Sequence, residues 1–315
     1  MRTQYLPNLS SVNSVGVTTE PNIKFRTTME DEHVIIDKFG GEADWGFFAI
    51  YDGHGGNQVS GFAKSYLDKK FLEYLKPDQV LKSFSESREN VGDLLSSDDF
   101  GDVEEDDEVS IESTESKGKI TPSLSTSSLS AMPGKIPDIF TKTYQKIDKM
   151  TKNKGFQSVG STAVTCFITK EDGVRKLYTA NVGDSRAVLC RNKKAVRLSF
   201  DHKPTVKEEE ERIISEGGFV SFNRTVGVLA VSRALGDHAI KPFVTNIPYV
   251  SEVELEDTDS FLILACDGLW DIYSDQEAVE LIIGMEKPEE MSQKLVKNAI
   301  DKGSTDNISC IVVIL

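Results

Sequence analysis

The chain has 315 residues, 38% of them hydrophobic, and a formal net charge of −15 at pH 7. This is enough for one large domain with a buried core or for two smaller ones, and the negative charge argues against nucleic acid or an anionic membrane as a partner. There is no signal-peptide stretch, no apolar run of membrane-spanning length and no CxxC pair among the four cysteines. We therefore expect a soluble protein with reduced cysteines, located in the cytoplasm or in both the cytoplasm and the nucleus.

The first predicted element is a hairpin of two strands. Residues 33–39 and 45–51 are mostly apolar runs on either side of a glycine-containing turn, so we expect them to pair. In that pairing the start of the first strand lies beside the end of the second. The hairpin therefore predicts that Glu30 and Asp31 lie close to Asp52 at one edge of a sheet.

The next predicted element is a helix over residues 57–75, because apolar residues recur at helical spacing. The side chains on its apolar face are Phe62, Tyr66, Leu67, Phe71 and Leu75.

Residues 83–134 differ in composition from the rest of the chain. Within them, 86–115 holds 13 acidic residues and one basic residue, so this stretch carries −12 of the net charge and leaves −3 for the remainder. A run rich in serine, threonine and proline follows. Such a composition buries too little apolar surface to offset its ordering entropy. We predict a mobile insert in a single domain spanning 1–315, serving either as an inert linker or as a docking tail.

The second half of the chain alternates between strands and helices. We predict a helix over 137–150 and then three strands, the last two joined by the turn NVGDSR (181–186) as a hairpin. A helix over 206–218 ends at glycine. Two further helices lie between FLILACDGLWD (261–271) and NISCIVVIL (307–315), which are apolar runs typical of buried strands. This order favours sheets covered by helices.

Carboxylates recur where the predicted strands end. Asp184 lies in the NVGDSR turn, Asp267 follows one apolar run and Asp306 precedes another. These acids are either dispersed turn residues or members of one cluster with the acids of the first hairpin. A cluster would cost several kcal/mol in repulsion unless cations neutralised it. Oxygen ligands select Mg²⁺, Mn²⁺ or Ca²⁺ over zinc.

Eight short motifs follow one another along the chain. They are RTTMED (26–31), DGHGG (52–56), GSTAV (160–164), NVGDSR (181–186), DHKP (201–204), GVLAVSRALGD (227–237), ACDGLWD (265–271) and STDNIS (304–309). This series resembles the metal-dependent, type 2C family of protein serine/threonine phosphatases over nearly the whole chain apart from the insert. The resemblance implies an α+β fold, an α-β-β-α sandwich of two antiparallel sheets flanked by helices, with a dinuclear metal site at one sheet edge. It also implies hydrolysis of phosphoserine and phosphothreonine in phosphorylated proteins.

The resemblance further implies a set of metal ligands for two Mg²⁺ or Mn²⁺ ions. Asp52 would bridge the two cations, with the carbonyl of Gly53 as a further ligand. Asp267 and Asp306 would complete the shell of the second metal. An Asp-Gly turn and two strand-end caps are the ordinary interpretations of these residues.

The resemblance implies that three other acids contribute to the site without binding the first two metals directly. Glu30 and Asp31 would hold metal-bound waters, although an exposed acidic strand start is the alternative. Asp184 would serve a third, weaker metal together with Asp267 and Asp271, or it would stabilise its turn.

The remaining candidate residues have other expected roles. His54 is expected to protonate the leaving alkoxide as a general acid, with a turn histidine bonded to an acid as the alternative. Arg26 is expected to grip phosphate oxygens, whereas Lys203 either packs or pairs. Asp237 either ligates metal or supports the site structurally. Val226 stands where many members of the family carry asparagine, which leaves the substrate preference of the neighbouring flap open.

Two other functions remain as alternatives: a catalytically silent, phosphoprotein-binding member of the same fold, and a two-metal nuclease. The complete set of acids together with Arg26 argues against the first, since a binder needs no dinuclear site. The absence of a basic groove signal argues against the second. We expect a monomer.

Overall fold

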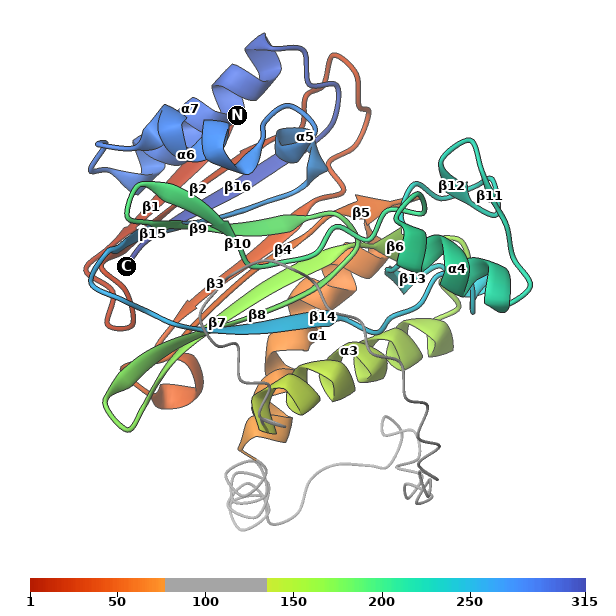
Figure 1. Cartoon of the computed structure of the whole chain (residues 1–315), viewed down its shortest axis with the longest axis horizontal. Helices are drawn as coiled ribbons and strands as arrows, with labels where there is room; N and C mark the ends of the chain where they lie inside the picture. Colours follow the sequence, from red (N-terminus) through yellow and green to blue (C-terminus); the bar gives the residue numbers. More distant parts are fainter. Residues whose placement is uncertain (77–134) are drawn as a thin grey trace, which may run out of the picture. The chain divides into compact units, whose positions relative to one another are not determined.

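Two antiparallel sheets form the centre of the computed structural model, which describes residues 1–76 and 135–315 (Figure 1). The insert predicted over 83–134 lies outside the described residues. The six-stranded sheet has the order β1 (Arg2–Pro7), β2 (Ser14–Glu20), β16 (Ile308–Ile314), β15 (Asp259–Ala265), β9 (Arg186–Arg191), β10 (Lys194–Arg197). The five-stranded sheet has the order β14 (Tyr249–Glu254), β8 (Val174–Val182), β7 (Ala163–Glu171), β4 (Gly46–Tyr51), β3 (Glu32–Asp37).

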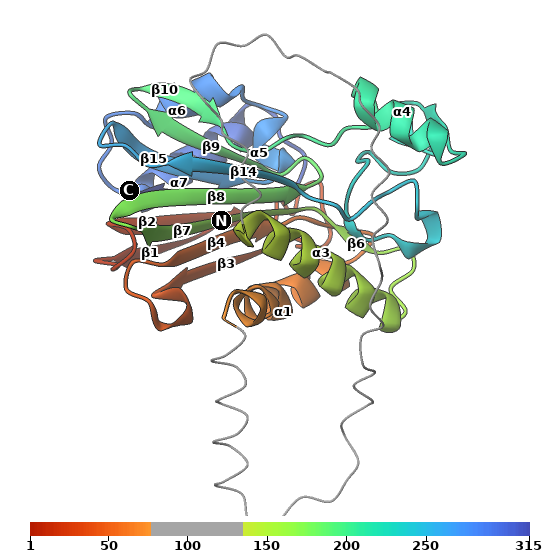
Figure 2. The same cartoon turned by 60° about the horizontal axis from the view of Figure 1, so that its bottom comes forward.

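Helices cover the outer face of each sheet. The five-stranded sheet carries α1 (Gln58–Leu75) and α3 (Lys135–Asn153), which lie side by side in Figure 2. The six-stranded sheet carries α6 (Asp275–Ile282) and α7 (Pro288–Asp301), with the short α5 (Asp267–Trp270) beside them (Figure 1). This helix–sheet–sheet–helix order confirms the predicted α-β-β-α sandwich.

Smaller elements lie near one end of the sandwich. A three-stranded sheet has the order β13 (Leu235–Gly236), β6 (Gly160–Ser161), β5 (Gly53–His54). Helix α4 (Lys207–Ser215) and the hairpin of β11 (Val220–Ser221) and β12 (Arg224–Thr225) lie at the same end (Figures 1 and 2). Among the described helices, none combines the length and the apolarity needed to cross a membrane.

Strand β4 is buried on both of its faces, which explains its continuous apolar sequence. Phe47, Ala49 and Tyr51 belong to the core between this sheet and helices α1 and α3. The alternate residues Phe48 and Ile50 belong to the core between the two sheets. Because successive side chains of a strand point to opposite faces, one strand supplies both apolar layers.

The first predicted hairpin is confirmed, and its register sets the position of the site. β3 pairs with β4 in antiparallel fashion, with Glu32 opposite Tyr51 and Asp37 opposite Gly46. The residues just beyond this ladder, Asp31 and Asp52, therefore lie beside each other where the two strands end.

The predicted helices are confirmed, with one error in a buried face. α1, α3 and α4 overlap the ranges 57–75, 137–150 and 206–218, and α6 and α7 follow β15. Tyr66 was predicted on the apolar face of α1 but is 42% exposed, because Val59 and Ala63 take the buried positions beside Leu67 and Phe71.

The predicted hairpin over 181–186 is wrong. β8 pairs with β7 and β14, whereas β9 pairs with β10 and β15, so the turn carries the chain from one sheet to the other. The Gly183 carbonyl accepts from the amide of His202 at 2.9 Å instead of joining a β8–β9 ladder. Each strand already has two neighbours in its own sheet, and this leaves no edge at which the two could pair.

Strands β1 and β2 were not predicted from the sequence pattern, because β1 is polar and largely exposed. β2 is fixed by close packing on α7. A Cβ on Gly16 would lie 2.2 Å from the backbone nitrogen of Glu289. Only glycine therefore allows the helix to approach the strand this closely.

The β11–β12 region contains a residue in an unfavourable backbone conformation. Val226 has a φ of 46°, in the left-handed region, and its amide donates to the carbonyl of Phe219 at 2.8 Å. Asparagine tolerates this region, whereas a β-branched residue is strained there. The asparagine that the family resemblance places at this position is therefore explained by backbone geometry.

Val226→Asn should raise the free energy of unfolding by about 1 kcal/mol, because a left-handed residue with an ordinary side chain costs roughly 1–2 kcal/mol. Urea denaturation measures the change. The matched control is Val228→Asn, since Val228 is 61% exposed and has no positive φ. An equal gain in both variants, or a loss in Val226→Asn, would show that backbone strain is not the cause.

Candidate active site and metal centre

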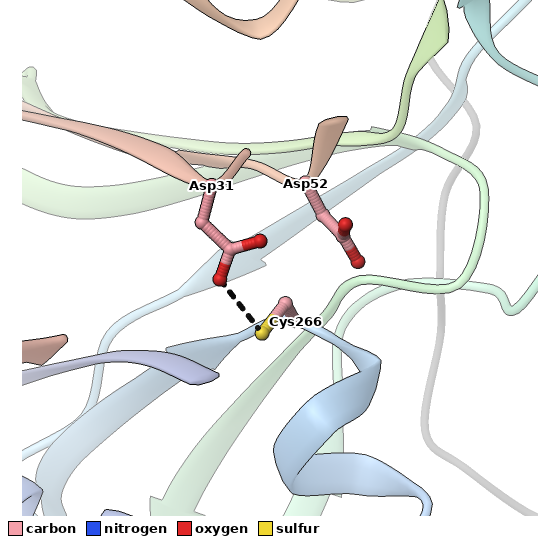
Figure 3. Close-up of side chains that lie close together, drawn as sticks. All are labelled: Asp31, Asp52 and Cys266. Atoms are coloured by element: carbon pink, nitrogen blue, oxygen red, sulfur yellow. Dashed lines mark hydrogen bonds between the residues drawn. The ribbon is translucent and has the colours of Figure 1, made fainter. Parts of the chain in front are cut away.

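The ends of strands from both sheets place carboxylates close together. Asp31 precedes β3 and Asp52 follows β4 in the five-stranded sheet, while Cys266 follows β15 in the other sheet. Figure 3 shows these three side chains close together at the ends of their strands. Each offers one potential ligand atom, and these atoms all lie within 4.8 Å of one another. Asp267, the next residue, begins α5 and adds a third carboxylate.

Burial makes these carboxylates hard to ionise. It raises the pKa of Asp31 from 3.8 to about 6. It also raises the pKa of Asp52 and of Asp267 well above 3.8, and neighbouring acids raise both further. For Asp52 the largest of these repulsions comes from Asp267. Three like charges therefore share one poorly solvated space, where a cation would stabilise them.

The chemistry of this cluster fits hard divalent cations. The Oδ1 atom of Asp31 is buried and has no hydrogen-bond partner among the described residues. An unsatisfied buried carboxylate oxygen is costly, and a metal ion or its bound water would satisfy it. Burial also raises the pKa of the Cys266 thiol well above 9.0. Cys266 therefore donates to Asp31 Oδ2, at 3.3 Å, as a neutral thiol.

Asp306 and Arg26 form the rim of the cluster. Their side chains make an ion pair, and Asp306 Oδ1 accepts from the amide of Asn307 at 2.7 Å. The side chains of Arg26 and Asp306 are 51% and 32% exposed. Arg26 is thus accessible to a phosphate, and Asp306 is near enough to raise the pKa of Asp52 by charge repulsion.

Glu30 and Gly53 pack against each other beside the acids. Glu30 Oε2 accepts from the amide of Gly56 at 3.2 Å, and Oε1 accepts from the hydroxyl of Thr28 at 2.9 Å. A Cβ on Gly53 would lie 2.6 Å from the Glu30 carbonyl oxygen, so glycine is required here. The Glu30 carboxylate faces this loop in the structure, and the roles of both residues toward metal stay predictions.

Lys203 forms ion pairs, which is one of the two roles considered for it. Its Nζ lies 2.6 Å from Asp184 Oδ2 and 3.7 Å from Asp271 Oδ1. Burial alone would lower the pKa of Lys203, but Asp184 and Asp271 raise it above 10.5. This ammonium already neutralises acids that were assigned to a third metal. A third cation would have to compete with it.

His54 contacts Asp237 at one side of the site. Its Nε2 lies 2.7 Å from Asp237 Oδ2. The contact joins Asp237 to His54, and the two roles considered for Asp237 from the sequence, ligation of metal or structural support, stay predictions. Of the other histidines, His202 is buried next to the Gly183 carbonyl, and burial lowers its pKa to about 3. His202 is therefore neutral and structural.

Comparison with known proteins agrees with this geometry. The sequence model of the family "Protein phosphatase 2C" matches residues 15–114 and 103–308. The chain belongs to this family. It is 37% identical to protein phosphatase 2C homolog 1 of Schizosaccharomyces pombe over 98% of the chain and 74% of that protein. It is 35% identical to protein phosphatase 2C homolog 1 of Saccharomyces cerevisiae over 96% of the chain and 93% of that protein.

Solved structures support the same fold. A serine-threonine phosphatase 2C from Toxoplasma gondii superposes with a TM-score of 0.67 at 20% identity, covering 99% of both chains. A C. elegans sex determining protein superposes with a TM-score of 0.70 at 24% identity, covering 97% of this chain and 65% of that one. At such identities the likeness concerns the fold alone.

Two residues of this phosphatase-family site were not selected from the sequence. Cys266 lies in ACDGLWD beside Asp267, and Asn307 lies in STDNIS beside Asp306. Asn307 Oδ1 accepts from the amide of Glu30 at 2.9 Å, and its Nδ2 donates to the carbonyl of Thr28 at 3.0 Å. Asn307 thus ties the Arg26 loop to β16. The position of Asn307 inside the STDNIS motif was the sequence signal that could have identified it.

Asp267→Asn should stabilise the metal-free protein, increasingly so as pH rises. The folded-state pKa of Asp267 is raised, so its penalty is absent below about pH 4 and grows as pH rises toward the folded pKa. Each pH unit in that window adds up to about 1.4 kcal/mol. The measurement is calorimetric Tm in EDTA between pH 4.5 and 8, taken as the difference from wild type at each pH so that contributions common to both proteins cancel.

The matched control is Asp257→Asn, an exposed carboxylate that should leave Tm unchanged at every pH. With saturating Mn²⁺ the sign should reverse, because the wild-type carboxylate then gains a partner. A constant difference between wild type and Asp267→Asn across this pH range in EDTA would contradict the electrostatic account.

Proposed function

We propose that the chain is a Mg²⁺- or Mn²⁺-dependent phosphatase that hydrolyses phosphoserine and phosphothreonine in proteins. The observation that carries this proposal is the cluster of Asp31, Asp52 and Asp267 at the ends of strands from both sheets. In a member of a protein phosphatase family, such a cluster supports a catalytic dinuclear centre. When bound there, two cations would supply an activated water for in-line attack on phosphorus.

The residues divide into inner and outer ligands under this proposal. Besides burial, the charges of both Asp267 and Asp31 raise the pKa of Asp52, and this shared proximity suits a bridging carboxylate. The Gly53 carbonyl and Asp306 add ligands at the edge, and Glu30 orients bound water. Because Lys203 pairs with Asp184, we assign Asp184 only to the weaker third site.

Arg26 would orient the substrate. Its guanidinium is exposed and has five N–H donors, of which the ion pair with Asp306 uses a part. A phosphate monoester presents two oxygens to such a fork. Arg26 would therefore hold the phosphoryl group next to the acids while Asp306 turns toward metal.

His54 would protonate the leaving group. The alkoxide of serine or threonine is a poor leaving group, and proton transfer to it is worth about 10²–10⁴-fold in rate. The side chain is 27% exposed and follows the proposed bridging ligand by two residues. It can therefore reach both the substrate and solvent.

Asp52→Asn should abolish Mn²⁺-dependent phosphate release from a phosphoserine and phosphothreonine peptide panel, because the bridging charge is lost while the shape is kept. Activity of the wild type should vanish in EDTA. The exposed Asp257→Asn serves as control and should keep full activity. Wild-type-like turnover by Asp52→Asn would refute the bridging assignment, and no turnover by the wild type at any metal concentration would favour a silent, phosphoprotein-binding member.

His54→Ala should lower kcat for alkyl phosphates such as phosphoserine peptides by about 10²–10⁴-fold. It should affect p-nitrophenyl phosphate much less, because nitrophenolate leaves without a proton. Steady-state kinetics with both substrates at saturating Mn²⁺ measure the two losses. Equal losses with the two substrates would remove the general-acid role.

A further inference from the structure

Three two-residue strands bring His54 and Asp237 together. In the small sheet, His54 of β5 lies opposite Gly160 of β6, and Gly160 lies opposite Gly236 of β13. Asp237 directly follows Gly236. The residues of DGHGG, GSTAV and SRALGD therefore meet at one place, with Gly160 on the strand between the other two.

Gly160 leaves the space through which the two side chains touch. A Cβ on Gly160 would lie 2.3 Å from His54 Nε2 and 2.1 Å from Asp237 Oδ2. Real Cβ atoms do not approach other heavy atoms so closely. Any side chain at residue 160 would thus push apart the 2.7 Å contact between His54 and Asp237.

The backbone that carries Asp237 is held by two further hydrogen bonds. The amide of Asp237 donates to the carbonyl of Val159 at 3.0 Å, and the amide of Gly236 donates to Asp148 Oδ1 at 2.8 Å. Asp148 lies on α3 and also accepts from Lys241 Nζ and Asn246 Nδ2, each at 2.7 Å. Asp237 is 4% exposed and has a φ of 53°.

We propose that Asp237 is the positioning residue of His54, and that Gly160 is glycine because this hydrogen bond crosses its α-carbon. With Nε2 donating to Asp237, the ring is fixed in one orientation. In the doubly protonated ring, Nδ1 then carries the proton that passes to the leaving alkoxide. This inference rests on the proposed function, because it specifies how the general acid is held.

A positioning role differs from metal ligation and from general support of the fold. Removing a metal ligand would lower the affinity of the protein for the cation. Removing a residue that supports only the fold would lower Tm, and it would reduce kcat by the same factor whether or not His54 is present. Asp237 should instead act through His54 alone, as the third group that orients a catalytic histidine.

The test is a double-mutant cycle of Asp237→Ala and His54→Ala, assayed with a phosphoserine peptide and p-nitrophenyl phosphate at saturating Mn²⁺. Asp237→Ala should lower kcat for the peptide by about 10–100-fold, by analogy with the loss seen when the partner that orients a metal-ligating histidine is removed. It should change p-nitrophenyl phosphate turnover far less. In the His54→Ala background it should have no further effect. Asp237→Asn should recover part of the loss, because its amide oxygen also accepts from Nε2.

Two readouts besides activity complete the design. Nitrogen NMR of the His54 ring, recorded in Mg²⁺ to avoid paramagnetism and at a pH high enough for the ring to be neutral, should show the single proton on Nε2 in the wild type and a tautomer mixture in Asp237→Ala. Mg²⁺ affinity by calorimetry should stay unchanged in Asp237→Ala. Gly160→Ala should reproduce the kinetic loss, and the control Gly61→Ala, where a Cβ meets nothing within 4 Å, should not.

The outcomes separate this inference from the function on which it rests. Wild-type kcat of His54→Ala with the peptide would overturn the general-acid role itself. If His54→Ala is impaired while Asp237→Ala is not, or if the two losses multiply, the positioning role is overturned and the general acid stands. A loss of Mg²⁺ affinity in Asp237→Ala would make Asp237 part of the metal centre. If Gly160→Ala does not fold, the cycle and the NMR of Asp237→Ala still decide.

Discussion

The structure depends on the burial of like-charged carboxylates where strands of both sheets end. At an effective dielectric constant of about 20, two unit charges 4 Å apart repel each other by about 4 kcal/mol. Asp31 and Asp52 meet under such conditions, Asp267 is near enough for its charge to raise the pKa of Asp52, and burial raises the pKa of each of the three. The sandwich can hold them ionised only with a compensating positive charge. This requirement links the fold to divalent cations more directly than any single motif does.

The charges of the chain show where that compensation is missing. At the rim, Arg26 pairs with Asp306, and Lys203 pairs with Asp184. Among the inner acids, Asp31 has an oxygen without a partner in the described part of the chain. Side chains of the protein thus neutralise the outer carboxylates, while the inner ones lack such partners and would be neutralised by bound cations under the proposed function. In that case a third metal at Asp184 would be weaker than the first two, because it competes with Lys203.

Much of the site could be predicted because the register of a hairpin is set by the residues of its own two strands and turn. The β3–β4 hairpin fixed the meeting of Asp31 and Asp52 from the apolar runs around one turn. The hairpin predicted over 181–186 was wrong, because two consecutive apolar strands have the same sequence pattern whether they pair in one sheet or belong to two different sheets. A bond from His54 to an acid was one of the two alternatives, but the identity of that acid as Asp237 was out of reach. It depends on strands of two residues, too short for any periodicity, and on a glycine whose role is the absence of a side chain.

The central claim is that the inner carboxylates hold a pair of divalent ions. Anomalous diffraction from crystals soaked in Mn²⁺ tests it most directly. The account predicts two manganese peaks about 3.5–4 Å apart, with the Asp52 carboxylate between them and Asp31 and Asp267 turned toward the pair. Crystals at saturating manganese with no paired peaks at these side chains, or with manganese bound only at Asp184, would contradict it.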